Sequence, residues 1–421
     1  MYIYIDIYSK IKYTVFIKIQ NNVYSKICIV RGRQKMFLKN LIEENRELIN
    51  QARLLHINGL VMPDTYIVDI DQLLENANAL KVKADSLNIS LYFMLKQLGH
   101  NPEIAKLLMN IGYDGAVCVD FKEAEIMMSH NIPISNIGHL VQIPHQLIYK
   151  VLKYGVKYVT VYTLEIMEEI NRIAKDLGIV QKVMLKVVDK DDYLYSGQEA
   201  GFELSSLNEY VSSFKTLSNL SIEGLTSFPM FMFDDQNKQF NPTNNYKTLL
   251  NAKIILEENG FKILNMNMPS STCINTLDLI SKLGGTSAEP GHGLTGTTPS
   301  HASIASIEKQ CVVYLTEVSH HYKGKSYVYG GGYYRRGNLK NALVINKAGK
   351  ETIDEVVLPN IDSIDYHFGL KGQYNVGDLV LMSFRFQIFT SRSNLVLVKG
   401  IKSNNPQVIG TYNAIGGKLN E

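Results

Sequence analysis

The sequence has few cysteines, no tryptophan and no long apolar run. Its four cysteines, Cys28, Cys118, Cys273 and Cys311, lie far apart in 421 residues and form no C-x-x-C pair. This spacing excludes both a zinc ribbon and a disulfide framework. Scattered single cysteines are typical of protein cores in a reducing compartment, so we expect a cytoplasmic protein. No apolar run reaches the ~18 residues of a membrane span, so no membrane partner is expected.

An excess of charge of one sign is also missing. The chain carries 43 Lys and Arg against 40 Asp and Glu, a net charge of +3. Nucleic-acid binding would require basic residues clustered on one face, so no nucleic-acid partner is expected. A hydrophobic content of 45% suits a globular protein with a sizeable core. The length leaves room for one large and one medium domain.

The first 35 residues stand apart from the rest of the chain. They are rich in Tyr, Ile and Lys, and they lack the apolar region and small-residue cleavage site of a signal peptide. We predict that Met36 is the functional start and that the extension 1–35 is dispensable. Residues 36–69 read as an amphipathic helix, Met36–Leu55, followed by a strand, "TYIVDID".

From residue 70 the chain alternates short apolar runs with amphipathic segments. This alternation predicts a (β/α)₈ barrel over 70–302. Beyond it, β-type runs separated by Gly, Asn and Lys turns predict a mainly antiparallel β domain over 303–421. The eight predicted barrel strands are residues 90–95, 115–120, 137–143, 158–163, 183–188, 223–228, 263–268 and 284–289.

Two features at the barrel's predicted first and eighth strands carry chemistry. Lys96 ends the first strand after four apolar residues, and a desolvated amine at a barrel mouth is nucleophilic toward a carbonyl. The loop "SAEPGHGLTGTTPSH", residues 287–301, suits an anion held by backbone N–H groups. Because these strands are neighbours in a closed barrel, the pair suits pyridoxal 5'-phosphate, with a Schiff base to the lysine and the phosphate on the loop. The alternative is an exposed strand-end lysine, which its position alone favours.

Five motifs resemble those of one enzyme family. "KQLGHNPEIA", "GHLVQIP", "AEPGHGLTGTTP", "SHHYKG" and "YVYGGGYYRRG" are similar to the alanine-racemase-like (fold type III) enzymes, and in particular to the YhfX-like amino-acid racemases. The resemblance covers about 36–416. It implies pyridoxal phosphate, an amino-acid substrate and racemisation through exchange of the Cα proton at Lys96. It also implies a homodimer whose active site combines one subunit's barrel with the other's β domain.

Glu289 is where the resemblance is most informative. Alanine racemases have an arginine before the P-G pair, whereas the ornithine and diaminopimelate decarboxylases of this fold have a glutamate. A carboxylate that faces the ring nitrogen favours the pyridinium, which is the stronger electron sink. The alternative is a strand-end carboxylate that only caps its loop.

The remaining cofactor contacts are implied by position. His292 stands where the decarboxylases have a phosphate-binding arginine, between the backbone amides of Gly291 and Gly293. Ser270 and Ser271, in "MPSSTC", fall where this fold often supplies a hydroxyl to the phosphate. Water-exposed loop residues are the alternative for both positions.

The β domain is implied to complete the site. In "EVSHHYKG", His320 falls on the proton-transferring tyrosine of alanine racemases, with His321 beside it, and histidine has a suitable pKa for this work. The segment "GGGYYRRG" places Tyr334 at the cofactor, with Tyr333 and Arg335 toward the pocket or the substrate carboxylate. The alternatives are surface histidines at a strand end and a hairpin with cross-strand aromatic packing.

Other members of the fold set the competing hypotheses. "FRFQIFTSRSN" lacks the H-x-C and H-x-D metal ligands of the D-threonine aldolases and D-serine dehydratases, so we expect no metal. Lys186 matches a lysine that is carbamylated in some alanine racemases, but "GQEAG" replaces its arginine partner, and we expect a structural role. A decarboxylase is the first alternative, favoured by Glu289 but lacking the cysteine–aspartate motif of those enzymes. A non-catalytic pyridoxal-phosphate carrier and a barrel enzyme without the cofactor are the others.

Overall fold

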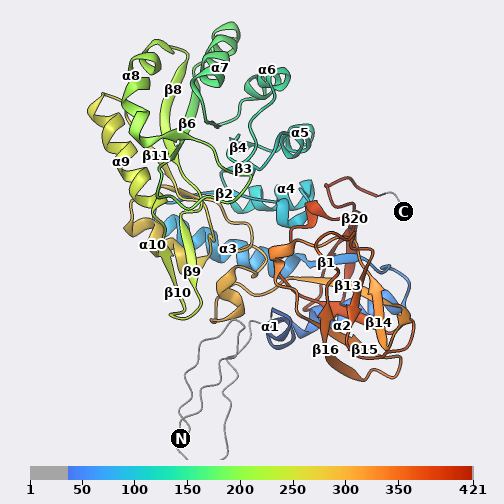
Figure 1. Cartoon of the computed structure of the whole chain (residues 1–421). Helices are drawn as coiled ribbons and strands as arrows, with labels where there is room; N and C mark the ends of the chain where they lie inside the picture. The colour runs from blue at the N-terminus through green and yellow to red at the C-terminus, as the bar shows by residue number, and fades with distance from the viewer. Residues whose placement is uncertain (1–36, 420–421) are drawn as a thin grey trace, which may run out of the picture. The chain divides into compact units, whose positions relative to one another are not determined.

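A parallel barrel and a mainly antiparallel β domain make up the described part of the chain (Figure 1). The structure is a computed structural model that describes residues 37–419. The predicted extension 1–35 and its dispensability lie outside the described residues. No helix within the described range is long and apolar enough to cross a bilayer.

The barrel is closed by eight parallel strands, as the alternation of the sequence predicted. Each strand pairs with the next, and Ala288 pairs with Leu91 to join the last strand to the first. Nearly all strand residues are buried, because the barrel interior covers one face and the helices cover the other. The strands are β2 (Ser90–Phe93), β3 (Gly115–Cys118), β4 (Ile134–Ile137), β5 (Tyr158–Val161), β6 (Gln181–Val188), β8 (Leu220–Thr226), β11 (Asn265–Asn267) and β12 (Ser287–Ala288).

The helices between these strands begin at polar caps close to the strand ends. Asp120 caps α5 by accepting from the N–H of Glu123 at 2.8 Å, and Thr163 caps α7 by accepting from the N–H of Ile166. The barrel's helices are α3 (Ile70–Ser86), α4 (Pro102–Ile111), α5 (Phe121–Ser129), α6 (His145–Tyr154), α7 (Leu164–Leu177), α8 (Leu207–Thr216), α9 (Asn245–Glu258) and α10 (Ile274–Lys282). Short strands β7 (Phe202–Glu203), β9 (Phe231–Asp234) and β10 (Gln239–Pro242) are insertions that we did not predict.

One predicted strand was wrong. We expected a strand over 137–143, but β4 ends at Ile137. Gly138 has a φ of 95°, and a Cβ there would lie 2.4 Å from the carbonyl oxygen of Thr160, so the chain turns at a position that only glycine tolerates. The side chain of Gln142, which lies within that predicted strand, instead donates to the carbonyl oxygens of Gly138 and Thr160. His139 therefore stands at the barrel mouth.

The β domain closes on itself and recruits a strand from the start of the chain. Strand β14 pairs with both β17 and β13, which closes a six-stranded antiparallel ring. The blue strand β1 (Thr65–Asp69) lies between β13 and β19, parallel to β19, and all its residues are buried (Figure 1). Helices α1 (Phe37–Glu44) and α2 (Arg46–Ile57) bury their apolar face on the same sheet. The strands are β13 (Val312–Tyr322), β14 (Lys325–Tyr329), β15 (Asn341–Ile345), β16 (Glu351–Val357), β17 (His367–Leu370), β18 (Leu379–Met382), β19 (Asn394–Lys399) and β20 (Gln407–Tyr412).

Candidate active site

A cavity of about 280 Å³ lies at the C-terminal ends of the barrel strands, and residues of the β domain complete its wall. Most of the residues that we predicted from the sequence line it. These are Lys96, Ser270, Ser271, Glu289, Gly291, His292 and Tyr334. Gly293 lies next to the lining loop, whereas His320 and His321 do not line the cavity of their own chain.

Lys96 reaches the cavity because it follows a strand whose last three residues, Leu91 to Phe93, are buried. It comes three residues after the end of β2 and begins the 3₁₀ turn η1 (Lys96–Leu98). Burial lowers the pKa of its amine to about 8, although the charges of Glu123 and Glu289 act in the opposite direction. An amine with this pKa is partly neutral near physiological pH, which is the form that attacks a carbonyl.

Glu289 is a buried acid with one oxygen in use and one free. Its Oε1 accepts from Nδ2 of Asn267 at 2.7 Å, and the carboxylate is only 4% exposed. Its Oε2 has no hydrogen-bond partner among the described residues. Burial raises the pKa of this carboxyl to about 7, opposed by the nearby side-chain amides of Asn267 and Asn136 and by the charge of Lys96. A cavity-lining acid with an unpartnered oxygen is suited to a donor supplied by a ligand.

Two loops present free backbone N–H groups beside Glu289. Within the described residues, no hydrogen bond is donated by the N–H groups of residues 270–272 or 291–293. Ser270 and Ser271 have φ values of 117° and 50°, which non-glycine residues rarely adopt, so this loop is held in an unusual conformation beside the cavity. Helix α10 begins just after the first loop, so its N-terminus adds favourable partial charge. The two loops together form a cradle for an anion such as a phosphate.

Glycine is required where these loops approach each other. A Cβ on Gly293 would lie 2.3 Å from the carbonyl oxygen of Thr272, and one on Gly291 would lie 2.7 Å from the side-chain amide of Gln97. Both contacts are far closer than real Cβ atoms allow. Gly293 therefore contributes by permitting the close approach of the two loops, and Gly291 by leaving room beside Gln97.

The ring of His292 is held by the protein on both sides. Its Nε2 lies 3.0 Å from the carbonyl oxygen of Phe386, and its Nδ1 lies 3.4 Å from Nε2 of Gln97. Since a carbonyl only accepts, the Nε2 of His292 carries the hydrogen and its Nδ1 accepts. Burial drives the pKa of this histidine well below its ordinary value, so the ring is neutral. These contacts leave its backbone N–H, more than its ring, available to an anion.

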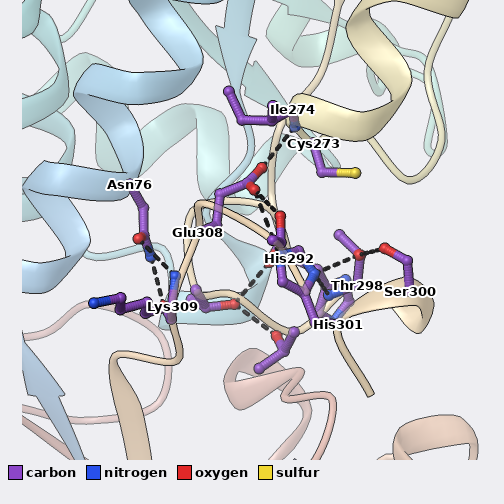
Figure 2. A network of polar contacts seen from close by, with 12 residues as sticks. Asn76, Cys273, Ile274, His292, Thr298, Ser300, His301, Glu308 and Lys309 are labelled. Carbon is purple, nitrogen blue, oxygen red and sulfur yellow. Dashed lines mark hydrogen bonds and ion pairs between the residues drawn. The ribbon is translucent and has the colours of Figure 1, made fainter. Parts of the chain in front are cut away.

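A buried polar network links the cavity residue Thr298 to the start of helix α10 (Figure 2). Thr298, which lines the cavity, lies 2.6 Å from Nδ1 of His301, whose Nε2 is 3.6 Å from a carboxylate oxygen of Glu308. The other oxygen of Glu308 accepts from the N–H of Ile274 at 2.6 Å, which caps the start of α10. Burial opposes ionisation of Glu308, but the hydrogen bond and charge of His301 hold the pKa of its carboxyl below the ordinary value. Asn76 joins the loop to the domain linker by donating to the carbonyl oxygens of Leu294 and Lys309.

Among the residues of the cavity wall that sequence reasoning missed are a histidine and two arginines. His139 is 1% exposed, neither ring nitrogen has a partner in the described chain, and burial lowers the pKa of its ring to about 3. This position was missed because we predicted that the preceding strand continues to residue 143, whereas it ends at Ile137. Arg336 and Arg385 also line the cavity. The arginine that we had named, Arg335, instead pairs with Asp365 at 2.8 Å and does not line it.

Two other predictions concern residues away from the cavity. His320 and His321 are exposed at the end of β13, where His320 stacks on Tyr327 with ring centroids 5.0 Å apart. Their predicted role depends on a second subunit and stays a prediction. Lys186 is 1% exposed and donates to the carbonyl oxygen of Gln198 at 3.1 Å.

Among residues 37–419 there is no group of three or more His, Cys, Asp or Glu arranged to hold a metal ion.

Comparison with known proteins places both halves of the chain. Residues 68–299 match the family model "Alanine racemase, N-terminal domain", and residues 313–408 match "YhfX-like, C-terminal domain". The uncharacterized protein YhfX of Escherichia coli (strain K12) is 41% identical over 386 residues, which cover 91% of this chain and 100% of that protein.

Solved structures share the architecture at low sequence identity. D-threonine aldolase from Filomicrobium marinum is 15% identical with a TM-score of 0.64, over 85% of this chain and 95% of its own. Alanine racemase of Clostridium difficile 630 in complex with cycloserine is 19% identical with a TM-score of 0.61, over 84% of this chain and 99% of its own. At this identity the likeness confirms the predicted fold and carries no statement about the reaction.

Proposed function

Because this chain belongs to the family that joins an alanine racemase N-terminal domain to a YhfX-like C-terminal domain, we propose that it is a pyridoxal-phosphate-dependent amino-acid racemase. The observation that carries the proposal is the placement of Lys96, Glu289 and two loops of free N–H groups around one cavity. An amine, an acid and an anion cradle are the complements of an aldehyde, a ring nitrogen and a phosphate.

The residues present fit this cofactor. With a pKa of about 8, about a tenth of the Lys96 amine is neutral at pH 7 and able to attack an aldehyde. A ring N–H would provide the partner that the buried Oε2 of Glu289 lacks, and burying such an atom unpaired is costly. The N–H groups of residues 270–272 and 291–293 would hold the phosphate without any side-chain charge.

Each residue then has a defined task in the reaction. When bound, the pyridine ring supplies an electron sink for the electron pair left at the substrate's Cα. Glu289 keeps a proton at the ring nitrogen, because an acid at that position favours the positively charged ring. Lys96 would accept the Cα proton at Nζ. Tyr334 and its neighbours in the β domain cover the cavity and limit the access of water.

Racemisation needs a second proton-transfer group on the opposite face of Cα. We propose His320 of a second subunit, with His321 beside it. Both are exposed on their own chain, at a strand end of the β domain, where the barrel of a second subunit can contact them. A homodimer is part of this proposal.

Two measurements test the assignment. Borohydride reduction of the purified protein should leave a pyridoxyl group on Lys96, seen by peptide mass spectrometry and lost in Lys96→Ala. Incubation with a panel of L- and D-amino acids in D₂O should deuterate Cα of one amino acid and interconvert its enantiomers. Absence of the adduct would overturn the cofactor, and an adduct without exchange on any amino acid would favour a non-catalytic carrier.

A decarboxylase is the second candidate, and Glu289 is the observation that favours it. An acid with a raised pKa and a free oxygen, facing a ring nitrogen, stabilises any Cα carbanion, including the one left by loss of CO₂. The same incubation separates the two reactions. Release of CO₂ in place of enantiomer exchange would establish the decarboxylase.

A further inference from the structure

Two arginines of the β domain share the cavity with Lys96. Arg336 lies in the 3₁₀ turn η4 (Arg335–Gly337), and Arg385 follows β18. The backbone N–H of Arg385 donates to the carbonyl oxygen of Gly337 at 2.8 Å, which holds the two segments side by side. The guanidinium carbon of Arg336 lies 4.2 Å from the ring centroid of Tyr195, so this side chain has a fixed support.

Neither guanidinium has a carboxylate partner within the described residues. Their neighbour Arg335 is paired with Asp365 at 2.8 Å, and on the surface Arg172 is paired with Glu169 at the same distance. By contrast, the Nε of Arg385 is buried and has no hydrogen-bond acceptor. Burial lowers the pKa of Arg385, and the charge of Arg336 adds to this effect. A buried cation without a counter-ion is costly, so a ligand has to supply the negative charge for Arg385. Arg336 is exposed, and it adds a second guanidinium to the lining of the same cavity.

The charges that line the cavity do not balance. Lys96, Arg336 and Arg385 are the cations, and Glu289 is the one carboxylate among the lining residues that the structure describes. The phosphate of the proposed cofactor already has its cradle of backbone N–H groups. The charges of both arginines lower the pKa of Lys96, so the pair lies close to the amine that the substrate would displace. The excess positive charge therefore faces the substrate's position.

We propose that Arg336 and Arg385 bind the two carboxylates of an amino dicarboxylic acid and so select substrates of the aspartate and glutamate class. This inference rests on the proposed function. A single α-carboxylate would pair with one guanidinium and leave the other without a counter-ion, whereas two carboxylates satisfy both. A planar guanidinium also matches a carboxylate with two parallel hydrogen bonds. Asparagine and glutamine have the same shape without the charge, and a site built for ionic pairing rejects them.

The first test measures binding without any turnover. Calorimetry on the purified protein should show that glutarate or succinate binds at least tenfold more tightly than butyrate. Arg336→Gln and Arg385→Gln should each reduce that preference at least tenfold, while the control Arg335→Gln retains it. Equal binding of glutarate and butyrate, or Gln variants that keep the preference, would overturn the proposal. If either Gln variant fails to fold, Arg336→Lys and Arg385→Lys take its place, because lysine keeps the charge. Each lysine variant should weaken glutarate binding severalfold. Lysine variants that bind glutarate as tightly as the wild type would also overturn the proposal.

The second test measures selectivity in the reaction. In D₂O, the holoenzyme should exchange Cα of glutamate or aspartate at least tenfold faster, in kcat/KM, than Cα of glutamine or asparagine. Exchange without this preference would overturn the inference and leave the proposed function intact. If borohydride leaves no adduct on Lys96 but glutarate still binds in an arginine-dependent way, the proposed function is overturned and the inference about the two arginines stands. If Arg385→Gln weakens cofactor binding and leaves glutarate binding unchanged, Arg385 serves the phosphate and the proposal is wrong.

Discussion

Replacing Glu289 by glutamine should stabilise the cofactor-free protein at alkaline pH. In the unfolded chain this carboxyl ionises near its ordinary pKa of 4.5, whereas burial raises the folded pKa to about 7. Between these values the folded state keeps a proton that the unfolded state has lost, so the stability of the wild type falls as pH rises. At about 1.4 kcal/mol per pKa unit, the full loss is about 3 kcal/mol. Glutamine keeps an oxygen to accept from Asn267 and has no proton to lose.

Urea unfolding of the cofactor-free wild type and Glu289→Gln at pH 5 and pH 8 measures this effect. The free energy of unfolding of the variant, relative to the wild type, should rise by about 2–3 kcal/mol between the two pH values. Glu209→Gln, at an exposed position of α8, is the control for the removal of one carboxyl group from the chain. A Glu289→Gln variant whose difference is the same at pH 5 and pH 8 would refute the reasoning that Glu289 is a buried acid with a raised pKa.

Three further predictions follow from the geometry of the site. Gly293→Ala should weaken cofactor binding at least tenfold in an absorbance titration. The reason is that its Cβ would meet the carbonyl oxygen of Thr272 at 2.3 Å and separate the two loops. Unchanged affinity would contradict the proposal that these loops hold the phosphate. Glu308→Gln should lower the free energy of unfolding by about 1–3 kcal/mol at pH 7. Because the folded pKa of Glu308 is lowered, the stability that its charge contributes is lost as pH falls. The difference in free energy of unfolding between Glu308→Gln and wild type should therefore be smaller at pH 4 than at pH 7. A difference that is the same at both pH values in urea melts would argue against the pair with His301. The rate at which borohydride traps added pyridoxal phosphate on Lys96 should rise with pH to a half-maximum near 8, and a midpoint near that of an ordinary lysine would show that its amine is not desolvated.

Local sequence patterns predicted the barrel because they depend on neighbouring residues alone. Buried parallel strands are continuous apolar runs and covering helices repeat every 3.6 residues, so both are visible in short windows. Lys96 could be assigned for the same reason, since it follows such a run directly. Glu289 follows the residues GGTSA, which are not an apolar run, and was assigned from its E-P-G motif and the family resemblance. These patterns were misleading at 137–143, where apolar residues continue past the end of β4. There the turn at Gly138 is required by the carbonyl of Thr160 on the next strand, which is a contact that no local window contains.

What the sequence by itself determined is the class of fold, the family and most of the residues that stand at barrel strand ends. Only the tertiary structure decided that β1 lies in the sheet of the C-terminal strands, that Arg336 rather than Arg335 faces the cavity, and that Arg385 joins it there. The oxygen of Glu289 without a partner was likewise visible only there. The reason is physical: strand and helix formation follow from the periodicity of adjacent side chains, whereas the charge balance of a cavity depends on how two domains pack around it.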